Sequence, residues 1–329
     1  MRYDEEFARL ADPFRPELLV HCYRMLGSMH DAEDLVQETY LRAWRSYGSF
    51  EGRSSLRFWL YRIATSACLT ALGHRSRRLL PSGLGAASDD PDEPLALAPG
   101  TDWVWPLPGR GVDPMAADPA AIIASRGSVR LALIAALQHL PSRQRAVLIL
   151  RDVLAWRAVE VADLLGMSTA SVNSALQRAR ARLEHVAPTE DNLVEPDEPA
   201  QRLLLDQFMA AFESADMDVL LQLLRHDVVM EMPPHATWFY GRDAVGRFIE
   251  AKVLAVPGVF RSVRTTANGQ PALATYARDR DGVHRAHALQ VLTVSGSQVS
   301  RIVSFLAPAL FAGFGLPLIL APARIPAIS

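Results

Sequence analysis

The chain has 329 residues, of which half are apolar and 21% are charged, as is typical of a soluble globular protein with two or three domains. Its two cysteines, Cys22 and Cys68, lack the CxxC spacing, which excludes a disulfide-based scaffold and a cysteine-rich metal site. The net charge of −2 conceals a basic segment, because residues 126–185 contain nine arginines against four acidic residues. Such a local surplus indicates one face for nucleic acid.

Residues 3–78 are predicted to form helices. Apolar residues recur at helical spacing from Phe14 to Leu26, and Gly27 ends this helix. Asp31 is the expected N-cap of the next helix. A third helix is expected from Ser55 to Leu72, and the stretch 49–64 that leads into it is rich in aromatic residues and arginine.

Two Pro-rich linkers are predicted, at residues 79–125 and 188–200. Trp103 and Trp105 are unusual in the first linker, because disordered linkers contain few aromatic residues, so we expect this stretch to dock on another part of the protein. Residues 126–187, between the linkers, are predicted to be helical. A helix starting at Ala121 extends into this block and ends at Leu140, and Ser142–Leu154 follows. Ala158–Leu165, the turn Gly166–Ala170 and Ser171–Leu183 have a helix-turn-helix pattern.

Residues 201–306 are predicted to form an α+β domain. Helices at Leu203–Ala215, Met217–Leu224 and Gly241–Ala255 accompany strands at Val228–Met232, Arg261–Thr266, Ala272–Arg278, His284–Val294 and Val299–Phe305. The apolar tail, residues 307–329, is interrupted by prolines, so we expect it to dock on the protein and not to span a membrane. The expected fold class is therefore multidomain, with two all-α domains and one α+β domain.

The stretch Asp31–Arg45, followed by residues 49–64, resembles region 2 of the sigma-70 family in its extracytoplasmic function (ECF) branch. The resemblance covers Phe14–Arg78 in order, and the region 2 domain is expected at residues 3–78. It implies that an acidic helix face docks on the β′ clamp helices of core RNA polymerase, where it would meet a basic coiled coil. The residues that match this core-polymerase-binding segment are Asp31, Glu33, Asp34, Leu35, Gln37 and Glu38.

In this family the loop and helix that follow read the −10 promoter element. Capture of an extruded base needs a small pocket, aromatic faces and nearby arginine. Some of the aromatic residues are also at core spacing, so at least one of them is expected to be structural. The matching residues are Phe50, Arg53, Ser54, Ser55, Arg57, Phe58, Trp59, Arg62 and Ser66; Ser66 stands where the family often has Asn.

Residues 126–187 resemble region 4 of the same family, which reads the −35 element with a helix in the major groove and contacts the polymerase β flap. The early residues of such a helix face base edges, and its arginines reach phosphates. The −35 candidates are Ser171, Asn173, Ser174, Gln177, Arg178, Arg180 and Arg182. Relatives usually have Lys or Arg near Asn173 or Ala175, so we expect a −35 contact that is either weaker or more dependent on hydrogen bonds.

Residues 201–306 resemble the SnoaL-like members of the nuclear-transport-factor-2-like superfamily, which are cones of curved sheet and helix. Such cones have an apolar pocket, and the candidate pocket residues are Glu231, His235, Trp238, Tyr240 and His287. An isomerase or cyclase would need a carboxylate beside a proton donor. No motif fixes such a pair, so we expect Glu231 and His287 to be ordinary, outward-pointing strand residues and this domain to modulate the sigma factor.

The sequence is thus identified as a member of the ECF sigma factors: a cytoplasmic DNA-binding protein whose partners are core RNA polymerase and promoter DNA. We expect no enzyme activity, cofactor, metal or membrane partner. Two alternatives stay open at this point. The C-terminal cone is a small-molecule-binding or catalytic domain, or the chain is a ligand-responsive helix-turn-helix regulator that does not bind polymerase.

Overall fold

The computed structural model describes residues 2–74, 76–109, 129–186, 198–254 and 256–320. They form two compact units. The helical unit comprises the described parts of residues 1–79 and 102–189, and the sheet unit those of 80–101 and 190–329. The predicted linker segments 110–125 and 188–197, the first part of the helix expected from Ala121, and the tail residues 321–329 lie outside the described residues.

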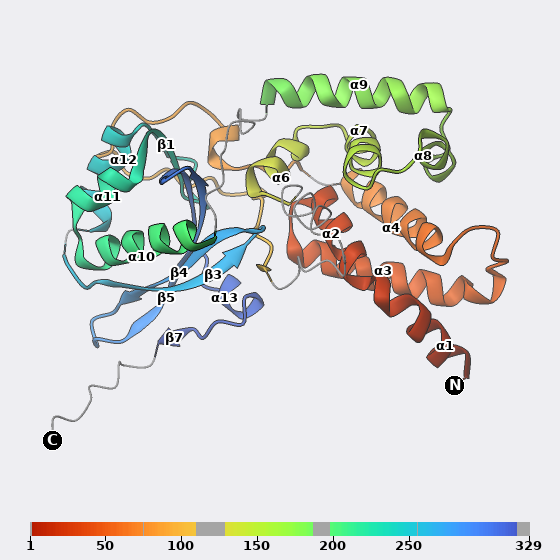
Figure 1. Ribbon diagram of the computed structural model, residues 1–329, viewed down its shortest axis with the longest axis horizontal. Coiled ribbons are helices and arrows are strands. Elements are labelled where there is room, and N and C mark those ends of the chain that lie inside the picture. Colours follow the sequence, from red (N-terminus) through yellow and green to blue (C-terminus); the bar gives the residue numbers. More distant parts are fainter. Residues whose placement is uncertain (1, 75, 110–128, 187–197, 255, 321–329) are drawn as a thin grey trace. The chain divides into compact units, whose positions relative to one another are not determined.

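The first part of the helical unit consists of α1 (Arg2–Ala11), α2 (Arg15–Leu26), α3 (Met29–Ser46) and α4 (Leu56–Leu72) (Figure 1). Gly27 ends α2 in the left-handed conformation, with φ of 70°, as the sequence suggests. The cap of α3 differs from the expectation: Ser28, and not Asp31, is the N-cap, and its hydroxyl accepts a hydrogen bond from the backbone N–H of Asp31.

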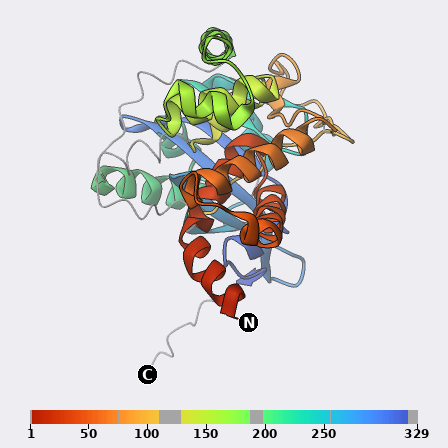
Figure 2. The same cartoon turned by 90° about the vertical axis from the view of Figure 1, so that its right-hand side faces the viewer.

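The second part contains α6 (Leu131–Gln138), α7 (Ser142–Leu148), α8 (Ala158–Leu165) and α9 (Thr169–Val186). The helix expected to run to Leu154 changes to a π-helical turn at Ile149–Val153. Gly166, with φ of 61°, ends α8 and makes the turn of the helix-turn-helix. Helix α9 lies across α7 and α8 (Figures 1 and 2).

A buried arginine joins the two parts of the helical unit. Arg145 of α7 is 4% exposed, and its guanidinium donates hydrogen bonds to the carbonyl oxygens of Met25, Gln138 and Leu140. Gln138 also donates to the carbonyl oxygen of Arg24, at 3.4 Å. Because an unpaired buried guanidinium is costly, these carbonyls fix how α7 packs on the end of α2.

The sheet unit begins with α10 (Glu198–Ser214) and α11 (Met217–Leu223), which precede the first strand. Its strands are β1 (Leu224–Glu231), β2 (Trp238–Tyr240), β3 (Phe260–Ala267), β4 (Gln270–Arg278), β5 (His284–Ser295) and β6 (Gln298–Phe305). Helix α12 (Arg242–Phe248) follows β2 and continues as a π-helical turn, Ile249–Val253.

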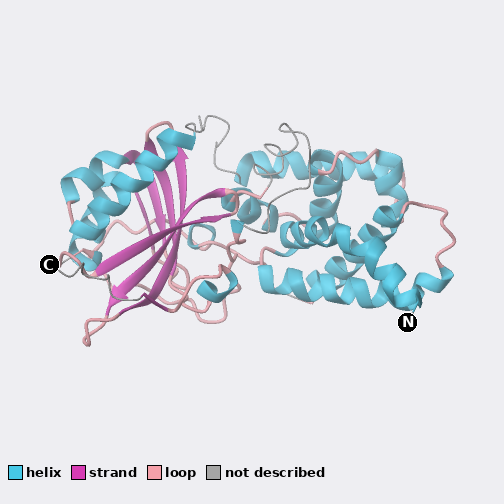
Figure 3. Cartoon of the chain, turned by 60° about the horizontal axis from the view of Figure 1, so that its bottom comes forward, coloured by secondary structure: helices cyan, strands magenta, loops and turns pink. Residues whose placement is uncertain are grey.

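The strands form one curved sheet in the order β2-β1-β6-β5-β4-β3 (Figure 3). The β1–β6 pair is parallel and the other neighbours are antiparallel. The helices pack on the sheet through buried aromatic rings: Phe208 and Phe212 of α10, Phe239 of β2 and Phe248 of α12. Burial of each ring stabilises the unit by about 1.5–3 kcal/mol.

Part of the predicted first linker belongs to the sheet unit. Residues 80–101, called the strap below, lie along the segment 231–238. Backbone hydrogen bonds connect Ala98 N–H to the Pro234 carbonyl at 3.3 Å and Ala236 N–H to the Ala96 carbonyl at 2.7 Å. The strap is therefore added to the C-terminal domain largely through its main chain.

The ends of the strap meet in the helical unit. Leu79 N–H donates to the Asp102 carbonyl at 2.9 Å, and Val104 N–H donates to the Leu79 carbonyl at 3.0 Å. Trp103 is 4% exposed, and Trp105 N–H donates to the carbonyl of Gly27. The two tryptophans that are unusual in the predicted linker thus hold residues 102–105 on the helical unit.

The described part of the apolar tail packs on the sheet. It contains the short helix α13 (Leu310–Gly313) and β7 (Ile319–Leu320), which pairs with β5. Phe311 is buried against Tyr276, with ring centroids 5.1 Å apart. None of the helices that the structure describes is long and apolar enough to cross a membrane. The predicted fold class, two all-α domains followed by an α+β domain, is confirmed.

Candidate nucleic-acid interface

The acidic residues of α3 differ in how far they face solvent. Glu33, Asp34 and Gln37 are exposed, whereas Leu35 and Glu38 are half-buried. Residues three and four apart lie on one face of a helix. Asp34 and Gln37 therefore share an exposed face with residues in the following turns of α3.

The following turns of α3 have exposed apolar side chains that were not among the predicted polymerase-binding residues. Leu41 and Trp44 are each 49% exposed, and with Asp34 and Gln37 they form the exposed stripe of α3. Large half-exposed apolar side chains beside acidic ones are typical of a protein-docking surface, and the i, i+3, i+4 spacing was the signal that could have found them.

Asp31 has a structural role in this arrangement. Its side chain is 10% exposed, and its Oδ2 lies 2.6 Å from Nη2 of Arg78. Arg78 also donates to the carbonyl of Trp103 at 2.9 Å. Asp31 is therefore not on the exposed stripe, and it fixes the chain that leaves α4 against α3.

The aromatic residues of the loop and of α4 form a continuous cluster. The Phe50 ring lies 4.8 Å from Trp59 and 6.3 Å from Tyr47, between centroids. Ser55 is the N-cap of α4, and its side chain accepts from the N–H of Phe58. The loop thus presents a ring surface whose geometry is set by the start of α4.

The charged and hydroxyl residues of this region surround that cluster. Arg53, Ser54, Arg62 and Ser66 are exposed, and Arg53 pairs with the neighbouring Glu51. A groove of about 370 Å³ lies beside them. It is lined by Arg42, Ser46, Trp59, Arg62, Ile63, Ser66 and Leu164. Three of the predicted −10 residues, Trp59, Arg62 and Ser66, therefore share one concave surface.

Arg57 is held by a carboxylate that the sequence analysis did not identify. Its guanidinium forms a two-nitrogen pair with Glu17 of α2, at 2.7–3.0 Å. The hydrogen bond to Glu17 raises the pKa of Arg57. Tyr61 also donates to Glu17, at 3.2 Å. Arg57 is thus held by α2, and because the Glu17 carboxylate offsets its charge, it supplies less free positive charge than the sequence suggests.

Phe58 is covered by a residue of the second helical part. Its ring stacks on Trp156, with centroids 5.2 Å apart and 16° between planes. The Tyr61 ring tilts against the same indole, with centroids 5.2 Å apart. Trp156 is 7% exposed, so the segment between α7 and α8 shields Phe58 from solvent. Trp156 was absent from the predicted site, because nothing in the local pattern ties it to α4.

The recognition helix α9 exposes its predicted base-facing residues. Asn173, Ser174, Gln177 and Arg178 are exposed, whereas Val172 and Leu176 are buried. Ser171 closes the first turn, because its backbone N–H donates to the Ser168 hydroxyl at 3.1 Å. The polar face of α9 is therefore free of packing against α7 and α8.

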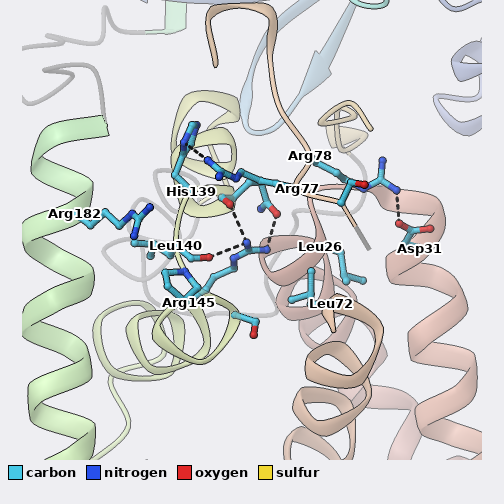
Figure 4. Close-up of a pocket in the computed structure, with 13 residues that line it drawn as sticks. Leu26, Asp31, Leu72, Arg77, Arg78, His139, Leu140, Arg145 and Arg182 are labelled. Atoms are coloured by element: carbon cyan, nitrogen blue, oxygen red, sulfur yellow. Dashed lines mark hydrogen bonds and ion pairs between the residues drawn. The ribbon is translucent and has the colours of Figure 1, made fainter. Parts of the chain in front are cut away.

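Two of the predicted phosphate-binding arginines differ in their surroundings within the helical unit. Arg180 pairs with Asp152 through two hydrogen bonds of 2.7 and 2.9 Å, which raise the pKa of Arg180. Arg182 lies at the edge of a second cavity, close to His139 and Arg145 (Figure 4).

The sheet unit buries Glu231, contrary to the expectation that it points outward. Glu231 is 0% exposed, and its Oε2 accepts from Arg301 at 2.6 Å. Its Oε1 accepts from the backbone N–H of Ser82 in the strap, at 2.9 Å. Both carboxylate oxygens are therefore engaged, one by β6 and one by the strap.

The other candidate pocket residues also lie around the strap or at the surface. Trp238 donates from its indole N–H to the Gly85 carbonyl at 3.0 Å, and His235 forms a β-bridge with Leu97. Tyr240 is 58% exposed, and His287, also exposed, tilts against Phe260. The structure brings Glu231, His235 and Trp238 together under the strap, and leaves Tyr240 and His287 outside that group.

Comparison with known proteins matches three successive parts of the chain to three family models. Residues 10–78 match the model of sigma-70 region 2, residues 130–183 that of sigma-70 region 4, and residues 205–302 that of the SnoaL-like domain. The ECF RNA polymerase sigma factor SigG of Mycobacterium tuberculosis (strain ATCC 25618 / H37Rv) is 52% identical over 95% of this chain and 84% of its own length. The chain belongs to the ECF sigma factors.

One further relative in this family matches the chain over most of its length, both in sequence and in structure. The ECF sigma factor SigJ of M. tuberculosis is 28% identical over 92% of each chain. The crystal structure of M. tuberculosis SigJ is similar in fold, with a TM-score of 0.63 at 24% identity, covering 95% of this chain and 99% of that one. The SnoaL-like part is thus shared by an ECF factor of known structure.

The helical unit contains region 2 in α2–α4 and region 4 in α6–α9. The strap lies between these two regions in the sequence. Region 4 packs on region 2 through Arg145 and Trp156. Phe58, near the start of α4, is therefore covered by region 4 of the same chain in this structure.

Proposed function

We propose that this chain is an RNA polymerase sigma factor that binds core polymerase, recognises −10 and −35 promoter elements and initiates transcription in the cytoplasm. The observation that carries the proposal is the presence of both sigma regions, in order, in a chain that shares half of its residues with a named ECF factor. The exposed surfaces of each region support specific roles.

The exposed stripe of α3 is proposed to dock on the β′ clamp helices. Asp34 and Gln37 supply polar and acidic contacts, and Leu41 and Trp44 supply apolar area. A charged rim beside a desolvated apolar centre gives both a faster encounter and burial on binding. Region 4 is proposed to bind the β flap, as the family resemblance implies.

The groove beside Trp59, Arg62 and Ser66 is proposed to hold the −10 element of the single strand. The indole of Trp59 and the exposed guanidinium of Arg62 both line the groove, which suits a stacked base and its phosphate. Phe58 is proposed to join this surface once region 4 moves away from it, because Trp156 now occupies its ring face.

The exposed face of α9 is proposed to read the −35 element. Asn173 and Gln177 carry side chains that can bond bidentately to adenine, and Arg178 lies on the adjacent face. Arg180 is committed to Asp152, so it supplies less free charge than the sequence suggests. This arrangement favours hydrogen-bond readout over phosphate attraction.

In vitro transcription with purified core polymerase tests the proposal. Start sites mapped across the genome on overexpression would supply the template promoters. We expect specific initiation with the wild-type chain, and at least a tenfold loss with Asp34→Arg or with Gln177→Ala; only Asp34→Arg should also weaken binding to core polymerase. Arg9→Gln, at an exposed position outside these surfaces, is the control. Promoter binding without initiation would identify instead a helix-turn-helix regulator.

The SnoaL-like domain is proposed to modulate the sigma factor and not to act as an enzyme. Support comes from the strap, which connects region 2 to region 4 and is held by this domain at Glu231, Thr237 and Trp238. Glu231 is the only carboxylate among the candidate pocket residues, and both of its oxygens already accept hydrogen bonds. A general base must reach the substrate, so the full burial of Glu231 beneath these two partners opposes that role.

A further inference from the structure

A cavity of about 270 Å³ lies where region 2 meets region 4 within the helical unit (Figure 4). Leu26 and Leu72 contribute from the ends of α2 and α4, and the segment after α4 contributes Arg77 and Arg78. The opposite wall consists of the chain from Gln138 to Ser142, with Arg145 of α7 and Arg182 of α9. None of the roles proposed above uses this cavity.

The lining has an excess of positive charge. It contains four arginines and a single acidic residue, Asp31, whose carboxylate is already paired with Arg78. Among the described residues, no carboxylate lies within ion-pair distance of Arg77, Arg145 or Arg182. Arg145 is bonded only to carbonyl and amide oxygens, which leave its net charge in place.

Two local observations reflect this positive field. Burial and the charges of Arg77, Arg182 and Arg145 lower the pKa of His139. The imidazole is therefore neutral at pH 7, and its Nδ1 accepts from Nη1 of Arg77 at 3.0 Å. The buried Nε of Arg145 has no hydrogen-bond partner among the described groups. The same positive charges that disfavour protonation of His139 favour a negatively charged ligand in this cavity.

We propose that this cavity binds the phosphate group of a small phosphate monoester. Arginine forks match phosphate oxygens in geometry as well as charge, and such charge-assisted bonds are about twice as strong as neutral ones. The cavity volume of about 270 Å³ lies just below the usual range for ligand pockets, so it fits a phosphate with a small organic body. Arg145 is 4% exposed, so it is out of reach of the backbone of a DNA duplex.

Such a ligand would couple the two sigma regions. Arg77 belongs to the end of region 2, and Arg145 and Arg182 belong to region 4. An anion held between them binds only while the regions are packed together. By mass action it stabilises that packed state against any state in which they separate.

Calorimetric titration and thermal unfolding of the full chain test the proposal, with inorganic phosphate, glycerol phosphate and adenosine monophosphate as probes and sodium chloride at matched ionic strength as reference. We expect saturable binding of at least one phosphate probe and a higher melting temperature than in chloride. Tighter binding of an ester than of inorganic phosphate would identify a phosphorylated metabolite; equal binding would identify free phosphate. Either result supports the site.

Arg77→Gln and Arg182→Gln, made separately, should each weaken the affinity for phosphate at least tenfold, while Arg9→Gln, which removes the same charge at an exposed position elsewhere, should leave it within twofold. Circular dichroism without ligand checks that each variant is folded. The proposal is overturned by no saturable binding of any probe, by equal weakening in all three variants, or by binding of DNA alone at this site.

Discussion

At the scale of single residues, His21 gives the helical unit a defined response to acid. It is fully buried in α2, and its Nε2 lies 2.9 Å from the Thr65 hydroxyl. Burial, with the nearby charge of Arg24, lowers its pKa from 6.5 to about 3. The unfolded chain therefore binds a proton between pH 6.5 and 3 that the folded chain does not, so stability falls as the pH falls through this window.

We expect His21→Gln to flatten that loss of stability, because glutamine keeps a donor for Thr65 without titrating. Urea unfolding at pH 4 to 7 can be followed by tryptophan fluorescence, since five of the six tryptophans lie in the helical unit. His185→Gln, at an exposed position in α9, is the matched control. An unchanged pH slope in His21→Gln would show that other groups control the acid response.

A second residue-scale prediction concerns the buried pair in the sheet unit. Glu231→Gln keeps the shape but leaves the guanidinium of Arg301, whose side chain is 15% exposed, without a counter-charge. Breaking a buried pair in this way costs about 3–5 kcal/mol. Hydrogen exchange should therefore show faster opening of β1 and β6. Asp227→Asn breaks a more exposed pair, with Arg225, and should cost about 1 kcal/mol or less. Equal effects of both variants would contradict the assigned role of Glu231.

At the scale of elements, the stacked pair of Phe58 and Trp156 connects α4 to region 4. Substitutions of these two residues should have opposite effects on the affinity for single-stranded DNA. Trp156→Ala uncovers the Phe58 ring, so we expect the affinity for a −10 single strand to rise about 2- to 10-fold, which corresponds to the usual energy of one aromatic pair. Phe58→Ala should lower it. Fluorescence anisotropy with oligonucleotides from mapped promoters measures both. A decrease in both variants, with folding verified by circular dichroism, would mean that the contact does not compete with DNA.

Element by element, the sequence predicts the structure well where side-chain periodicity is the signal. The helices of both sigma regions and the long strands β4, β5 and β6 follow from such patterns. The three-residue strand β2 is too short for one. The strap was predicted as a linker because its bonds to Pro234 and Ala236 are made by main-chain groups, which leave no side-chain pattern. The arginine cavity depends on residues 77, 145 and 182, which only the fold brings together.

At the scale of the whole molecule, the strap lies in sequence between region 2 and region 4 and packs in the sheet unit. The hydrogen bond from Leu79 to Asp102 joins its two ends, so the folded-back strap removes residues 80–101 from the length of chain that connects the two regions. The contacts at Thr237 and Trp238 hold it in that form. We therefore expect that loss of these contacts lengthens the connection between the two regions and favours their separation on polymerase, so that the sheet unit restrains initiation.

We accordingly expect Trp238→Ala, and deletion of residues 198–329, to raise promoter-specific transcription several-fold while core-polymerase affinity stays within about twofold. Losing one or two hydrogen bonds to the strap, at roughly 1 kcal/mol each, is enough for such a change. Tyr240→Ala is the matched control, because Tyr240 is exposed on the same strand and makes no hydrogen bond to the strap in the described structure. Multi-round transcription and polymerase binding should be measured on the same preparations. Unchanged or lower output from Trp238→Ala, with binding intact, would exclude the strap as the element through which the SnoaL-like domain restrains initiation.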